Sequence, residues 1–254
     1  MEILGTDLQA ALPFVVIGFF AQLIDGALGM AFGAIASALL VGVMGVPPAR
    51  ASYQIHIVKC FTTAASGVSH ALSGNIDKRL FLLVLPAGVA GGVLGAYGLA
   101  RLDGEAIRPF IFAYLGVLGV LLIGKGLRKT ARKQTPKGAV PLGFLGGILD
   151  AIGGGGWGPV VSSGLMLQGT EPRKVVGSVN AAEFFVAIAI SAAFLLHLGL
   201  EEFTAATLGL LLGGVLAAPL GALAAKYLPA PVMLVIVGTV LTASTIYWLV
   251  QEFL

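Results

Sequence analysis

Long apolar segments follow one another along almost the whole chain, and they constrain the fold more than any other feature. Of the 254 residues, 57% are hydrophobic and only 11% are charged. About 20 apolar residues span the core of a bilayer as a helix, and so apolar a chain cannot form a soluble domain. We therefore predict an all-α polytopic membrane protein. The predicted segments are 8–25, 29–45, 50–72, 79–100, 107–126, 139–152, 156–169, 173–198, 203–227 and 231–251.

The same composition argues against several other classes of protein. The loops are short, so no separate soluble domain fits, and an enzyme would need its machinery inside the membrane. The sequence has no Ser-His-Asp order, phosphate-binding loop or nucleotide fingerprint. The single cysteine, Cys60, lies in an apolar run, and the three histidines lack metal-ligand spacing. We predict no enzymatic activity, no metal and no cofactor.

Basic residues gather in one loop and indicate the topology. Residues 125–137 contain six of the fifteen Lys and Arg and no acid. By the positive-inside rule this loop is cytoplasmic, so its charge is not interpreted as a nucleic-acid-binding surface. Counting crossings outward from it places both termini outside. We predict a multi-pass protein of the cell inner membrane.

The chain contains an internal repeat. Residues 18–37 align with residues 143–162 at an offset of 125, and residues 45–59 align with residues 169–183 after one residue drops out. Each half holds an odd number of segments, so the second half is predicted to be inverted relative to the first. Inverted-topology repeats are typical of secondary transporters.

The repeat suggests how each half is built. The segments 139–152 and 156–169 are too short to cross a bilayer, since about 14 helical residues extend only about 21 Å. Each repeat is therefore predicted to open with a broken or re-entrant glycine-rich hairpin, followed by three transmembrane helices. Whether the first hairpin crosses or re-enters is left open. We predict repeat 1 over 1–126, a basic cytoplasmic linker over 127–138 and repeat 2 over 139–254.

Glycines mark the tips of both predicted hairpins. The run from Gly153 to Gly156, ahead of Trp157, would break a helix at membrane depth, where free backbone survives only inside protein or beside a wet cavity. The amides that open the next half-helix would carry partial positive charge and form an anion site, with Gly29 and Gly33 as the symmetry mate. The alternative is close helix packing through small residues.

Ionisable residues at membrane depth need a reason. The repeat alignment pairs Lys59 with Glu183, which we expect to lie near each other. Two interpretations remain: a structural ion pair, or a working pair in which Lys59 attracts the anion and Glu183 takes up a proton. Asp25 and Asp150 end the first half-helix of each hairpin, where they would cap freed backbone amides. His56 and Thr63 share the helix face of Lys59, and Asn180 that of Glu183. The candidate substrate-binding residues are Lys59, His56, Gln54, Thr63, Gly29, Gly33, Gly153, Gly154, Gly155, Gly156, Trp157, Ser178 and Asn180.

These motifs resemble a known family. GGILDAIGGGGWGPVV with EPRKVVGSVNAAEFF, and the weaker first copy LIDGALGMAFG with VPPARASYQIHIVKCFTTAASG, look like the sulfite exporter TauE/SafE family of bacterial and archaeal membrane transporters. The resemblance covers nearly the whole chain and implies ATP-independent transport of sulfite, sulfoacetate or a related organosulfonate. The first copy departs from the pattern at Met30-Ala31 and at Lys59.

The leading hypothesis is a secondary transporter that exports a small sulfur-containing anion by alternating access at a mid-membrane site between the repeats. The alternative is an anion channel, which would show a continuous aqueous path and no proton dependence. The expected partners are the anionic substrate and the lipid bilayer. A homodimer is one oligomeric state that lipid-facing glycines would favour.

Overall fold

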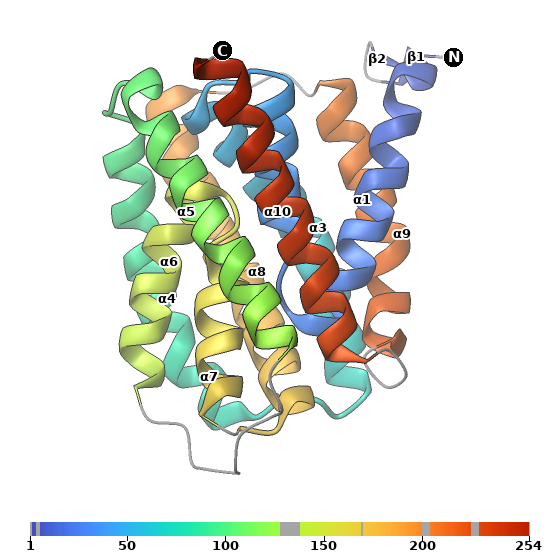
Figure 1. The fold of residues 1–254 in the computed structure, drawn as a ribbon. Coiled ribbons are helices and arrows are strands. Elements are labelled where there is room, and N and C mark those ends of the chain that lie inside the picture. The colour runs from blue at the N-terminus through green and yellow to red at the C-terminus, as the bar shows by residue number, and fades with distance from the viewer. Residues whose placement is uncertain are drawn as a thin grey trace.

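The chain folds into one bundle of helices that run side by side (Figure 1). The computed structural model describes residues 2–3, 6–127, 138–168, 170–199, 204–224 and 229–253. A short antiparallel pair, β1 (Glu2–Ile3) with β2 (Thr6–Asp7), precedes the first helix. The helices are α1 (Leu8–Leu28), α2 (Phe32–Ser37), the π-helix η1 (Ala38–Val43), α3 (Pro48–Leu72), α4 (Lys78–Leu99), α5 (Gly104–Gly126), α6 (Ala139–Gly153), the π-helix η2 (Gly158–Ser162), α7 (Ser163–Leu167), α8 (Pro172–Leu198), α9 (Ala205–Ala224) and α10 (Ala230–Phe253).

Several of these helices are membrane spans by length and composition, and the prediction of an all-α polytopic membrane protein is confirmed. Large apolar side chains such as Phe20, Leu121 and Leu216 are exposed on the outside of the bundle, where lipid would surround them. Helix α3 is less apolar because polar side chains line its buried face. Within the described residues, five candidate spans are found: Gln9–Leu28, Lys78–Leu99, Pro109–Gly126, Arg173–Leu198 and Ala205–Ala224.

Both halves open with a helix that breaks at glycine. Helix α6 has 15 residues and ends at Gly153, so it extends only about 22 Å, too short to cross. Helix α1 has 21 residues and extends about 31 Å, long enough to cross, before it breaks after Leu28. The first hairpin, α1–η1, therefore has a longer opening arm than the second, α6–α7.

The chain ends indicate an even number of crossings. Both termini lie at the same end of the bundle, and α7 lies at the opposite end (Figure 1). The second hairpin therefore closes at the end away from the termini. The basic loop over 128–137 lies outside the described residues, so the membrane side that each end faces stays a prediction, as does the division into repeats at 127–138.

The two halves are interleaved rather than stacked as separate units. Helix α1 packs along α9, and α6 packs along α4, so each opening helix lies against a helix of the other half. Helix α3 packs on α8, and α5 on α10. Glycines allow the close approach: a Cβ atom at Gly26 would lie 2.9 Å from the Cα atom of Gly221. Small residues are the common device for packing helices in membranes.

Ala31 is the one non-glycine residue with positive φ among the described residues, at 146°. This backbone conformation is strained for a residue with a Cβ atom. We expect Ala31→Gly to raise the free energy of unfolding by about 1 kcal/mol, because it removes that strain. The measurement is the midpoint of thermal unfolding in detergent. The matched control is Ala36→Gly in α2, a buried alanine with helical backbone, which we expect to destabilise by about 1 kcal/mol. If both variants lower the midpoint of thermal unfolding equally, the backbone at Ala31 is not strained.

Candidate functional site

The tips of the two hairpins contact each other inside the bundle. The Ser162 hydroxyl, at the end of η2 in the second arm of the α6–α7 hairpin, donates to the Gly29 carbonyl oxygen at 2.9 Å. A Cβ atom at Gly155 would lie 2.5 Å from the Cα atom of Ala34, and one at Gly33 would overlap the Gly154 carbonyl. The predicted glycines are therefore used for close backbone packing between the hairpins. Whether their amides also bind an anion stays a prediction.

The two tips have the same local geometry. Gly29 and Gly154, which the repeat alignment matches, have φ of 68° and 70°. Their amides donate to the carbonyls of Asp25 and Asp150 at 2.5 and 2.7 Å. The Asp25 carboxylate accepts the amide of Phe32 at 3.1 Å, and the Asp150 carboxylate accepts that of Trp157 at 3.1 Å. Each carboxylate thus accepts the amide of the residue seven positions on, and the capping role of both aspartates stays a prediction.

Lys59 lies buried between two carboxylates of the other half. Its Nζ atom is 2.9 Å from both carboxylate oxygens of Asp150 and 2.6 Å from Oε1 of Glu183. The side chains of all three residues are at most 4% exposed. An ammonium with three donors thus has all of them directed at carboxylates. The Lys59 side chain thus links α3 to both the α6–α7 hairpin and α8.

His56 extends the charged cluster by one helical turn. Its Nε2 atom is 3.0 Å from Oδ2 of Asp150, and its Nδ1 atom is 2.7 Å from the Ser52 carbonyl oxygen. A carbonyl oxygen only accepts, so Nδ1 carries a hydrogen, and the contact with Asp150 needs a second hydrogen on one of the two partners. His56 and Lys59 thus contact the same carboxylate from one face of α3.

The cluster contains more carboxylates than cations. Asp25 is also buried, at 4% exposure, and interacts electrostatically with Lys59 and Asp150. The carboxyl groups of Asp25, Asp150 and Glu183 thus interact with one another and share Lys59. A bare anion that entered this cluster would meet repulsion unless a proton entered with it.

The remaining candidates are spread along α3 and α8. Thr63 donates to the Lys59 carbonyl, and the Asn180 amide donates to the Ser66 hydroxyl at 3.2 Å. Gln54 accepts from Thr207 on α9 at 3.0 Å. Ser178 accepts the backbone amide of Asp77 at 2.7 Å, at the start of α4. The structure therefore brings Asn180 toward the cluster and gives Gln54 and Ser178 structural partners elsewhere.

Trp157 fills the space beside the second hairpin. Its side chain is fully buried, and its indole N–H donates to the Val179 carbonyl at 3.1 Å. A Cβ atom at Gly88 on α4 would overlap the ring. Trp157 therefore packs between α4 and α8.

One face of α3 carries a continuous stripe of polar residues that the sequence already shows. The polar residues of α3 recur at spacings of four and three, which places them on one helix face. His70, near the helix end, is fully buried, and its Nε2 atom is 3.0 Å from the Gly26 carbonyl oxygen. The complete stripe is Ser52, His56, Lys59, Thr63, Ser66 and His70.

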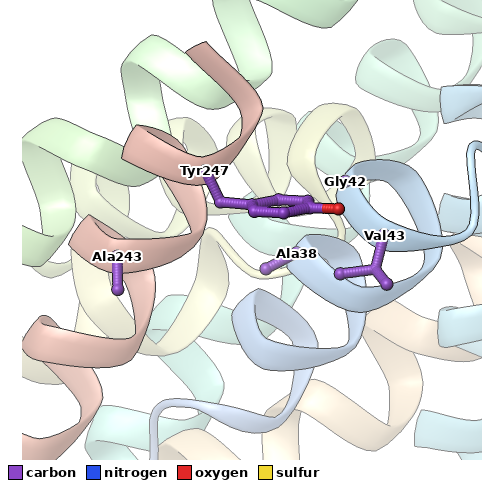
Figure 2. Close-up of a pocket in the computed structure, with 5 residues that line it drawn as sticks. All are labelled: Ala38, Gly42, Val43, Ala243 and Tyr247. Atoms are coloured by element: carbon purple, nitrogen blue, oxygen red, sulfur yellow. The ribbon is translucent and has the colours of Figure 1, made fainter. Parts of the chain in front are cut away.

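A cavity of about 230 Å³ lies away from the charged cluster. Figure 2 shows it between η1 and α10, with the Tyr247 hydroxyl directed toward Gly42 and Val43. Its lining, Ala38, Gly42, Val43, Ala243 and Tyr247, includes none of the candidate site residues. The described residues also contain no group of three or more His, Cys, Asp or Glu that could hold a metal ion.

Buried ion pairs at the meeting of two broken helices are typical of polytopic membrane proteins that move solutes. The sequence model of the family "Sulfite exporter TauE/SafE" matches residues 14–248, so the chain belongs to this family of membrane transporters. It is 38% identical, over 257 aligned residues, to the "Probable membrane transporter protein YtnM" of Bacillus subtilis (strain 168). The match covers 97% of this chain and 85% of that relative. No solved structure matches the chain.

Proposed function

We propose that the protein is a secondary transporter of the inner membrane that exports a small sulfur-containing anion, such as sulfite, sulfoacetate or a related organosulfonate, without converting it chemically. The observation that carries the proposal is the buried contact of Lys59 with Asp150 and Glu183 at the meeting of the hairpins. A charge at membrane depth is costly, so it marks a solute or proton pathway by default.

Alternating access is consistent with the ion pairs that join the two halves. Lys59 comes from the first half, and both of its carboxylate partners come from the second. If the halves rock about the hairpin contact, these ion pairs have to separate and form again. The equal geometry of the two tips supports an inverted repeat, in which the two halves exchange roles as the site opens to either side.

Glu183 is the proton-coupling group in this proposal. Only its Oε1 atom contacts Lys59, and its Oε2 atom has no partner among the described residues. A proton on Glu183 would neutralise one of the two carboxylates that hold Lys59. The ammonium would then be available to the substrate anion, so uptake of the proton and binding of the anion would favour each other.

We expect Glu183→Gln to keep anion flux but to remove its dependence on an imposed pH gradient, because glutamine cannot exchange a proton. The measurement is flux of radiolabelled sulfite, sulfoacetate and sulfate in proteoliposomes at several pH gradients. The matched control is Glu171→Gln, an exposed glutamate that pairs with Arg173 and should leave the gradient dependence unchanged. Unaltered coupling in Glu183→Gln would remove Glu183 from the mechanism, and wild-type flux without any pH dependence would favour an anion channel.

A further inference from the structure

Four buried side chains near Lys59 have polar atoms without a protein partner. They belong to α1, α3 and α8, and all four are at most 3% exposed. An unpaired buried polar group costs about 1–3 kcal/mol, so a native protein needs a reason to keep several together. The unpartnered atoms are Oε1 and Nε2 of Gln22, Oγ1 of Thr62, Oδ1 of Asn180 and Oε2 of Glu183. Elsewhere in the described residues, unpartnered atoms occur singly on Asn75, Tyr114 and Thr170.

The contacts between the helices place these four side chains around one region. Thr62 follows Lys59 by three residues on α3, and Ser66, one turn further, accepts from Asn180. Gln22 lies one turn before Gly26 on α1, whose carbonyl oxygen is 3.0 Å from Nε2 of His70 on α3. Gln22 is therefore near the level of Ser66, and Asp25, three residues after Gln22, interacts electrostatically with Lys59 and Glu183.

The unpartnered atoms are donors and acceptors without net positive charge. The Gln22 amide and the Thr62 hydroxyl offer hydrogens, and the oxygens of Gln22, Asn180 and Glu183 offer lone pairs. Lys59 has all three donors on carboxylates. A ligand that satisfies such a set has acceptor oxygens and at least one acidic hydrogen, and carries little negative charge.

The second half has no equivalent of this region. The repeat alignment matches Gln22 to Gly147, and the same offset carried three residues past the second aligned block matches Thr62 to Val186; neither Gly147 nor Val186 has a polar side chain. Trp157 is buried beside Val186, which lies with it against Gly88. Gln22 and Thr62 thus add polar side chains in the first half that have no counterpart in the second, beside Asn180 and Glu183 of α8.

We propose that Gln22, Thr62, Asn180 and Glu183 form the binding site for the oxygens of the transported anion, and that the anion enters as a protonated monoanion. Gln22 and Thr62 donate to its oxygens, and its acidic hydrogen is donated to Asn180 or to Oε2 of Glu183, so that the anion itself brings the proton that Glu183 takes up. This inference rests on the proposed function and adds the residues and the charge state of the substrate.

The first test separates binding from folding. Because an apolar side chain relieves an unpaired buried group, Gln22→Leu and Thr62→Val should unfold at the same or a higher temperature than the wild type. Each variant should raise the KM for sulfite flux about tenfold, while Thr62→Ser, which keeps the hydroxyl, stays near the wild type. The matched control is Thr245→Val, since the Thr245 hydroxyl donates to the carbonyls of Phe112 and Leu241. This control should lose stability and keep its KM.

The second test concerns charge. Wild-type proteoliposomes should move hydrogen sulfite at mildly acidic pH in strong preference to sulfate, a dianion without an acidic hydrogen. Equal rates for the two anions, or an unchanged KM in both Gln22→Leu and Thr62→Val, would overturn the inference while the proposed function stands. Absence of sulfite, sulfoacetate and sulfate flux in the wild type would instead refute the proposed function, and this binding site with it.

Discussion

Lys59→Met is expected to leave little folded protein. The substitution keeps an unbranched side chain of similar length but removes the charge that pairs with Asp150 and Glu183, which are 0% and 4% exposed. Breaking a buried ion pair by removing one partner costs about 3–5 kcal/mol, a large part of the stability of a typical protein. The measurements are the yield of monodisperse protein in detergent and the midpoint of thermal unfolding.

The control for this variant also removes the charges of both ion-pair partners of Lys59. Lys59→Met combined with Asp150→Asn and Glu183→Gln leaves no uncompensated charge at the ion pairs, and the asparagine introduced in place of Asp150 still offers an oxygen to the Trp157 amide. We expect this combination to recover most of the lost stability and to show no anion flux. If Lys59→Met alone folds as well as the wild type, the ion pairs contribute nothing to the fold and serve transport only.

Gly155→Ala is expected to separate the two hairpin tips. The added Cβ atom would lie 2.5 Å from the Cα atom of Ala34, and backbone atoms on both sides leave it no flexible neighbour to displace. Overpacking in a well-packed interior costs about 1–3 kcal/mol, and this contact is backbone to backbone, so we expect the upper end of that range. Because the charged cluster is built on these tips, anion flux should fall along with the midpoint of thermal unfolding.

The matched control is Gly98→Ala in α4. A Cβ atom at Gly98 has no neighbour within 4 Å, and its backbone is helical. Alanine is favoured over glycine inside a helix, so this variant should be neutral or more stable by about 0.5–1 kcal/mol. If Gly155→Ala behaves like Gly98→Ala, the hairpin contact tolerates movement and the glycine run has another purpose.

The sequence alone predicted the elements of the fold. Each helix in a bilayer satisfies its own backbone, so runs such as 79–100 and 173–198 predict helices close to the α4 and α8 of the structure without knowledge of tertiary contacts. Glycine breaks a helix locally, and the run at 153–156 therefore located the end of α6. The repeat alignment also paired Lys59 with Glu183, which the structure places 2.6 Å apart.

Only the tertiary structure decided how the charges are shared. The alignment gives Asp25 and Asp150 the same position, and both accept an amide seven residues on. Asp150 nevertheless also binds Lys59 and His56, while the symmetry mate of the Lys59–Asp150 contact would join Glu183 to Asp25, two carboxylates that repel each other. Hydropathy and glycine spacing are local properties of the sequence, so they can give the two halves a similar backbone. Which side chain pairs with which depends on residues far apart in the chain, so the unpaired Gln22 and Thr62 became visible only when α1, α3 and α8 were packed together.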